Sequence, residues 1–374
     1  MNLAIRHIIS IILLMLVPFA LPAQQKVTLG VMLPLHRNDG DGKRMLEYYR
    51  GMLLAAEDLK KQNVSVTIKA WNIPSTADLS TVLRSEVAGT CNIVFGPLYT
   101  PQVEEIGDFC RANDAKLVIP FSITGDDVDD NAFIYQVWQS PEELLSASAD
   151  VFVTRFGDSH PIFIDCKDSK FPKGNFTAKL RSKLDKRGIK YSITSLNSSS
   201  AEFSKAFSDD NRNVIVLNSA SSPSLNAAMH KLDDVMLSRP GAMISLFGYT
   251  EWLMYEKYDL NRFFKYDTYI PTTFYTNTSD WKTRQLERRY EEDFHEPMQT
   301  ALPRFAISGY DYTMFFVNGW LQFGRTFTGS RWQQPYKAIQ SPLKFVRTER
   351  GGFRNKCFML VHYNTNLQIE TLSY

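Results

Sequence analysis

The feature that most constrains this chain is a repeated alternation of short apolar runs with longer amphipathic segments between residues 27 and 166. The runs are VTLGVMLPL, VSVTIKAWNI, NIVFGPLYT and KLVIPFSIT, with Gly, Pro, Ser or Thr near their ends. Buried parallel strands have this composition, and crossover helices must connect them. The pattern predicts an α/β fold whose binding loops lie at the carboxyl edge of a parallel sheet.

The same alternation returns after residue 138, beginning with a helix over 141–155 that follows the capping sequence SPEE. The run FIYQVWQ at 133–139 reads as a strand that crosses into this second unit. Later segments do not complete a third unit: we expect a strand over 266–275, helices over 281–294 and 306–323, and a terminal hairpin. These pieces must complete two Rossmann-like lobes that have already begun.

The first 23 residues differ from the rest of the chain. Arg6 and His7 precede the apolar run IISIILLMLVPFALPA, and the polar QQK follows it. This order is typical of a cleaved secretory signal peptide, with the cut expected after Ala23. An uncleaved anchor is the alternative, although the run is short of the roughly 20 residues that span a bilayer. We therefore expect export to the periplasm.

Composition and charge exclude several classes of protein. In 374 residues, 44% are hydrophobic and 22% are charged, which is typical of a globular protein. The 42 basic and 40 acidic residues give a net charge of +2 and are spread along the chain, so we expect no nucleic-acid partner. Four cysteines, Cys91, Cys110, Cys166 and Cys357, permit two disulfides, but buried free thiols explain them equally well. We expect no metal site and no cofactor, because the six His residues lack ligand spacing.

The ordered set of motifs resembles type I periplasmic binding proteins, particularly the branched-chain amino acid receptor type of ABC transporter substrate-binding proteins. The matching stretches are VTLGVMLPL, RGMLLAAEDL, IVFGPLYTPQV, LVIPFSIT, FIYQVWQSPEE and AISGYDYTMFFVNGW. The resemblance implies two lobes joined by three crossing segments. The first lobe would be 26–138 plus 278–325, and the second 139–277 plus 326–374. It also implies that the lobes close on a ligand, which shifts the population toward the closed state.

On the first lobe, the resemblance directs attention to the loops after two strands. Tyr99 and Thr100 follow one strand, and Ser122 and Thr124 follow the next. Their hydroxyl and backbone N–H groups suit a carboxylate. For Thr100, a plain helix N-cap is the alternative.

On the second lobe, Phe171 takes the place of the family's aromatic residue before Gly-x-Gly, but Pro172 replaces the expected glycine. Tyr249 and Glu251 follow a later strand, where the amino acid receptors hold the ligand's ammonium with an acidic group. A first-turn Glu favoured by the helix dipole is the alternative for Glu251. We assign Trp138 and Tyr275 to hinge packing, and Tyr310 and Asp311 to structural roles.

No catalytic motif is present, so we expect a protein that is not an enzyme. The acidic run DDVDD is interpreted as a solvated loop. The first hypothesis is a periplasmic protein that captures an amino acid or similar small polar ligand and delivers it to a membrane permease. The alternative is a cell-envelope interaction protein that contacts cell-wall enzymes, similar to penicillin-binding-protein activators, which LGVMLPL and FGPLYTPQV also resemble.

Overall fold

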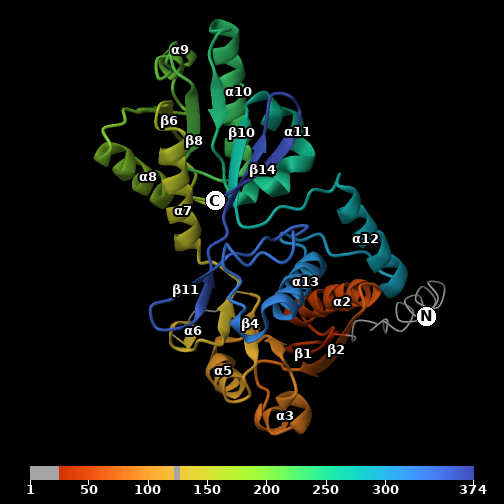
Figure 1. Ribbon diagram of the computed structural model, residues 1–374. Coiled ribbons are helices and arrows are strands. Elements are labelled where there is room, and N and C mark those ends of the chain that lie inside the picture. The colour runs from red at the N-terminus through yellow and green to blue at the C-terminus, as the bar shows by residue number, and fades with distance from the viewer. Residues whose placement is uncertain (1–24, 122–126) are drawn as a thin grey trace, which may run out of the picture.

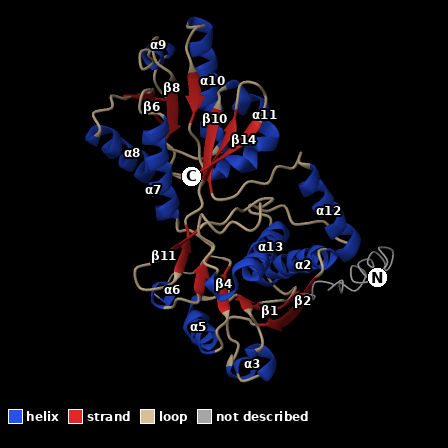
Figure 2. Cartoon of the chain, viewed as in Figure 1, coloured by secondary structure: helices blue, strands red, loops and turns tan. Residues whose placement is uncertain are grey.

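The computed structural model describes residues 25–121 and 127–374. Its ribbon divides into two lobes, one below and one above in Figure 1, with irregular segments passing between them. Each lobe combines strands with flanking helices, as Figure 2 shows. The predicted signal peptide lies outside the described residues, as do Ser122 and Thr124.

The first lobe is built on a seven-stranded sheet with the order β11-β12-β5-β4-β3-β1-β2. Its strands are β1 (Gln25–Leu33), β2 (Val64–Asn72), β3 (Ile93–Phe95), β4 (Lys116–Ile119), β5 (Ile134–Gln136), β11 (Phe345–Arg347) and β12 (Phe353–Asn355). All neighbours in this sheet are parallel except β11 and β12. The carboxyl ends of β1 to β5 therefore meet at one edge.

Alternating side chains bury both faces of this sheet. In β3, Ile93 and Phe95 pack on the face covered by α2 (Gly40–Lys61) and α13 (Phe305–Phe323), whereas Val94 packs on the opposite face. That face is covered by α5 (Val103–Ala112), preceded by the 3₁₀ turn η1 (Thr100–Gln102). The remaining short helices of this lobe are α3 (Ser80–Leu83), α4 (Glu86–Gly89), α6 (Asp127–Asp130) and η3 (Gly324–Thr326). Both faces being buried explains why these strands read as continuous apolar runs.

Two glycines allow α2 and α13 to pack with their backbones in close approach. A Cβ atom on Gly51 would lie 1.9 Å from the carbonyl oxygen of Ala306, and one on Gly309 would lie 1.9 Å from that of Tyr48. No side chain fits between the two helices at these points. The helix α12 (Trp281–Phe294) also packs on α2, through Leu286.

The second lobe repeats the strand order of the first. Its parallel sheet has the order β7-β6-β8-β9, with β6 (His160–Asp165), β7 (Ser192–Ser195), β8 (Asn213–Leu217) and β9 (Ile244–Leu246). A bridge between Phe247 and Tyr269 links it to the sheet β10-β13-β14, formed by β10 (Thr268–Thr272), β13 (Met359–Tyr363) and β14 (Ile369–Ser373). In both lobes the chain order reverses beside the first strand, between β1 and β3 and between β6 and β8, and ligands bind at such points in folds of this kind.

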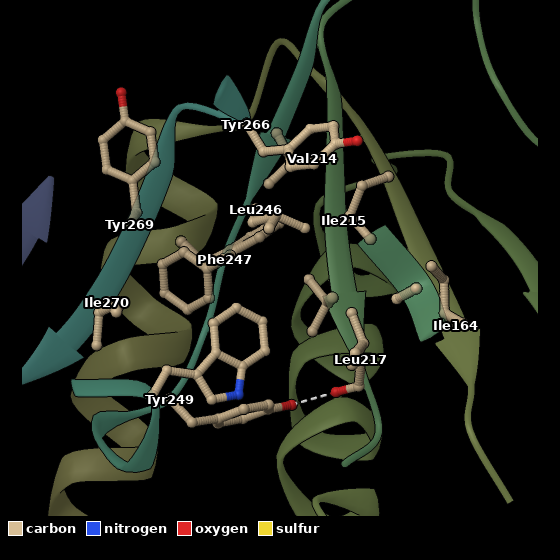
Figure 3. Packing of buried hydrophobic residues seen from close by; sticks show 14 of the residues in the cluster. Ile164, Val214, Ile215, Leu217, Leu246, Phe247, Tyr249, Tyr266, Tyr269 and Ile270 are labelled. Atoms are coloured by element: carbon tan, nitrogen blue, oxygen red, sulfur yellow. Dashed lines mark hydrogen bonds between the residues drawn. The ribbon is translucent and has the colours of Figure 1, made fainter. Parts of the chain in front are cut away.

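An aromatic-rich core holds the second lobe together. Figure 3 shows Phe247 among residues of β8, β9 and β10, and Tyr249 donating a hydrogen bond to the carbonyl of Leu217. The helices around this core are α7 (Pro141–Arg155), α8 (Gly174–Lys186), α9 (Ser200–Ser204), α10 (Ser222–Ser238), η2 (Thr250–Tyr255) and α11 (Glu256–Lys265). The expected helices over 141–155 and 281–294 have the predicted bounds.

Within the described residues, three segments cross between the lobes, at 137–140, 273–280 and 356–358. The last crossing corrects our expectation that all of 326–374 belongs to the second lobe. Strands β11 and β12 extend the first sheet because Phe353 pairs with Tyr135, and the two rings stack with centroids 4.5 Å apart. Only β13 and β14 join the second lobe. Short antiparallel strands carry no sequence signal that tells which sheet they extend.

Several local expectations also need correction. The acidic run around α6 is not simply a solvated loop, because Asp129 forms a two-pronged ion pair with Arg354 at 3.0 and 3.2 Å. Thr100 is the first residue of η1 rather than its N-cap, which is Tyr99. The four cysteines are free thiols.

Candidate functional site

A cavity of about 700 Å³ lies between the lobes at the carboxyl ends of the strands. Both lobes and the first two crossings contribute to its lining, and Asn355, the last residue of β12, lines it directly before the third crossing. Its volume is within the range of about 300–1,000 Å³ that small-molecule sites occupy. The cavity therefore lies where the doubled strand order places a binding site.

The wall from the first lobe is formed by the start of α2, the loop after β4, and α13. Asp39 caps α2 by accepting a 2.7 Å hydrogen bond from the backbone N–H of Gly42, which fixes the first turn that carries Asp41 and Arg44. The rings of Phe121 and Phe305 contact each other at 5.4 Å between centroids. Further lining residues of this wall are Met45, Leu98, Pro120, Leu302, Pro303, Tyr312, Ser341, Pro342 and Leu343.

The wall from the second lobe is formed by the starts of α7, α8 and η2. Ser140 caps α7 through a capping box with Glu143, so the first turns of that helix face the cavity. Lys173 precedes α8, and its backbone N–H donates to the carbonyl of Asn218 at 2.8 Å. The lining residues here are Pro141, Leu144, Leu145, Ser148, Lys173, Phe176, Tyr249, Thr250, Glu251, Met254 and Pro271.

The first crossing lines the cavity and is hydrogen-bonded to the chain around the third crossing. The side-chain amide of Asn355 donates to the carbonyl of Val137 at 3.1 Å, and that of Gln139 donates to the carbonyl of Cys357 at 2.6 Å. Trp138 lies between these two contacts in the chain and lines the cavity. A hinge motion must therefore pass through residues that a ligand can touch.

The charges of the lining are paired within each lobe. Among the described residues, the charged ones that line the cavity are Asp41, Arg44, Lys173 and Glu251. Arg44 pairs with Asp41, and its guanidinium lies 6.0 Å from the ring centroid of Phe305. Lys173 pairs with Glu251 at 2.5 Å, and its ammonium lies 5.2 Å from the ring centroid of Tyr249. The rest of the lining is mainly aromatic and aliphatic.

Tyr249 is held rigidly beneath Lys173. It is buried, and burial raises the pKa of its hydroxyl well above the ordinary value. The hydroxyl donates to the carbonyl of Leu217, and the ring meets Phe176 and Trp252 edge to face, at 5.6 and 5.9 Å between centroids. The ring, rather than the hydroxyl, is therefore what this residue offers to the cavity.

The structure brings together only part of the set of site residues predicted from the sequence. Tyr249 and Glu251 line the cavity. Tyr99, Thr100 and Phe171 are not among its described lining residues. The hydroxyl of Tyr99 donates instead to Asp41 at 3.4 Å, and 54% of Phe171 is exposed to solvent. Ligand contact by these three residues stays a prediction, as does contact by Ser122 and Thr124.

Sequence reasoning missed several lining residues. From the sequence we assign Trp138 to hinge packing, although a segment that crosses between two lobes also borders the cleft between them. Lys173 stands in the predicted loop DCKDSKFPKGN, where attention went to Phe171. Arg44 lies near the start of α2 and Phe305 is the first residue of α13, and neither follows a strand, so no pattern in the chain indicated them. Asp311, given a structural role, accepts backbone N–H groups from Ile339, Gln340 and Ser341.

The described residues hold neither a metal cluster nor a helix that could span a membrane. No group of three or more His, Cys, Asp or Glu side chains within 25–121 and 127–374 could hold a metal ion. Over the same ranges, no helix has the length and apolar character needed to cross a membrane.

Comparison with known proteins gives likeness in structure and not in sequence. No protein-family model and no curated protein matches the chain. Among solved structures, a putative branched-chain amino acid ABC transporter from Rhodospirillum rubrum is similar at 14% identity and a TM-score of 0.57 over 93% of this chain and 100% of that one. A branched chain amino acid ABC transporter periplasmic ligand-binding protein from Burkholderia xenovorans LB400 has 14% identity and a TM-score of 0.47 over 92% and 94% of the two chains. An ABC transporter substrate-binding protein from Desulfitobacterium hafniense has 13% identity and a TM-score of 0.46 over 93% and 100%.

At such low identity, the likeness to the Rhodospirillum rubrum structure concerns the fold. It agrees with the two sheets of repeated strand order, the three crossings and the cavity between the lobes. The chain therefore has the two-lobe α/β fold of the type I periplasmic binding proteins.

Proposed function

We propose that this protein is an exported solute-binding protein, which captures an amino acid or a similar small ligand between its lobes and delivers it to a membrane transporter. The observation that carries the proposal is the cavity of about 700 Å³ that both lobes and two of the three crossings line. A ligand held there touches both lobes at once, as binding by closure requires. The predicted signal peptide supports export to the periplasm.

The physical basis of the proposal is differential binding. A ligand that contacts Phe305 on one lobe and Phe176 on the other gains more contacts when the lobes approach. It therefore shifts the population toward the closed form by the difference in affinity between the two forms. We propose that Tyr249 and Glu251 are among the contacts on the second lobe. No chemical step is needed for this role, so the proposal describes a protein that is not an enzyme.

A stability and scattering screen of the chain without residues 1–23 tests this proposal. A ligand at about 100 times its Kd stabilises the folded state by about 2.7 kcal/mol, which raises the Tm by roughly 5–10 °C. Each compound that raises the Tm is then tested by small-angle X-ray scattering, where closure decreases the radius of gyration. A library of amino acids, carboxylic acids and their amides that gives neither change would refute the proposal.

The transporter partner needs a separate experiment. We expect that the ligand-loaded protein, cross-linked in cell envelopes, captures a membrane permease. Recovery of cell-wall enzymes without a permease would instead favour an envelope interaction protein on the same fold.

A further inference from the structure

We infer that the captured solute has an aromatic or branched aliphatic body and no ammonium group, because the chain's own Lys173 already fills the acidic position of the cavity. This inference rests on the proposed function and specifies its ligand. The proposed function allows either an amino acid or a similar small ligand. The geometry favours a small ligand that is not an amino acid.

The arrangement around Lys173 is that of an ammonium site with its cation in place. The ammonium of Lys173 lies 2.5 Å from a carboxylate oxygen of Glu251 and 5.2 Å from the ring centroid of Tyr249. A carboxylate and an aromatic face are the groups that bind a ligand's ammonium. Here both act on a side chain of the protein itself.

The lysine is held at this position by the backbone. Its N–H donates to the carbonyl of Asn218, and Pro172, the residue before it, bridges to Ser219 beside the end of β8. The residue therefore stands at the fixed junction between a bridge and α8. About a quarter of its side chain, 26%, is exposed, so its charge lies against the protein rather than in open solvent.

A ligand carrying its own ammonium must compete with this lysine. It either displaces Lys173 from Glu251, leaving the lysine without its carboxylate, or lies beside a like charge. Both outcomes weaken binding, because like charges brought together in a partly desolvated site repel. The other acidic group of the lining, Asp41, is also occupied, by Arg44 of its own helix.

The remaining walls select for apolar bulk. Trp138, Phe176, Phe274, Phe305 and Tyr312 present aromatic surface from both lobes and from two of the crossings. Burial of apolar ligand surface against such walls supplies the binding energy, and the paired charges need not be disturbed. An aromatic or branched aliphatic molecule that lacks the amine satisfies both conditions.

Isothermal titration calorimetry on matched pairs tests the inference. The pairs are L-phenylalanine with 3-phenylpropionate and L-leucine with 4-methylvalerate, which differ only in the amino group. For the wild-type chain we expect the compound without the amine to bind at least about tenfold more tightly in each pair that binds. In Lys173→Met, Glu251 is free, and we expect the amino acids to gain about tenfold. The double variant Lys173→Met with Glu251→Gln is the matched control, which keeps the lost lysine but should lose that gain.

The outcomes separate the two levels of the proposal. If the wild-type chain binds the amino acids as tightly as their partners, or if the ligand found by the closure screen carries a free ammonium, the inference is overturned and the proposed function stands. A screen that finds no ligand and no closure overturns the proposed function itself. Because the wild-type comparison needs no variant, failure of Lys173→Met to fold does not affect the decision.

Discussion

Substituting Gly309 by alanine tests the close packing of α2 on α13, on which one wall of the cavity depends. The new Cβ would lie 1.9 Å from the carbonyl oxygen of Tyr48 and 3.3 Å from the backbone nitrogen of Met52. Ordinary carbon contacts have separations of about 3.5 Å, so the helices must move apart by about 1.6 Å locally. Since the obstacle is backbone rather than a flexible side chain, no rotamer change relieves the overlap.

The expected cost follows from two opposing effects. Overpacking against a rigid neighbour costs roughly 1–3 kcal/mol, and a backbone obstacle places this case near the upper end. Alanine regains up to about 1 kcal/mol over glycine in helix propensity. We therefore expect Gly309→Ala to lower the free energy of unfolding of the first lobe by about 2 kcal/mol. For a unit of this size, that decreases the Tm by roughly 4–8 °C.

Thermal and urea unfolding, followed by circular dichroism, measure this change. Gly174→Ala is the matched control, because Gly174 also lies in a helix, as the first residue of α8, and no atom lies within 4 Å of a Cβ placed there. We expect the control to be as stable as the wild type or slightly more so. Gly51→Ala should repeat the loss, and the double variant with Gly309→Ala should lose less than the sum, because one separation accommodates both methyl groups. A Gly309→Ala protein as stable as the Gly174→Ala control would refute the close approach of the two helices.

Three further predictions concern buried charges and the cavity. Burial raises the pKa of Asp311 to about 6, so its stabilising contribution is complete below about pH 4 and is lost as the pH rises through 6. Asp311→Asn should lower the free energy of unfolding by roughly 2–4 kcal/mol. Urea unfolding should show a larger loss at pH 4.5 than at pH 7.5. The ammonium of Lys116 donates to the carbonyl of Phe327 at 2.8 Å, and burial lowers its pKa to about 8. The stability of the wild type relative to Lys116→Met should therefore rise by about 1 kcal/mol between pH 7 and pH 9. An unchanged difference would contradict a charge buried at neutral pH. Trp138→Ala should weaken the binding of a ligand that closes the lobes by roughly 1–3 kcal/mol in calorimetry, with little change in the Tm of the free protein. A decrease in Tm without a loss of affinity would indicate hinge packing alone.

The strand and helix pattern could be read from the chain with little loss. The helices at 141–155 and 281–294 have the expected bounds because each has its own start signal, Ser140 with Glu143 in one case and Asp280 in the other. The doubled α/β alternation was readable because both faces of each parallel sheet are buried, which leaves unbroken apolar runs. Such signals depend on residues a few positions apart, and the chain carries them wherever it folds.

The sequence pattern could not predict contacts between residues that are far apart in the chain. Nothing local tells β12 to pair beside β5, more than 200 positions earlier, so the last crossing was expected about 30 residues too early. The same holds for the cavity, where Lys173 reaches Glu251 and leaves the predicted ammonium acceptor already occupied. The sequence by itself determined two α/β lobes and the edge where they bind, because periodicity and capping act over one turn or one strand. Only the tertiary structure decided which side chains meet at that edge, because a side chain's partners depend on how far-separated segments pack and not on the residues beside it.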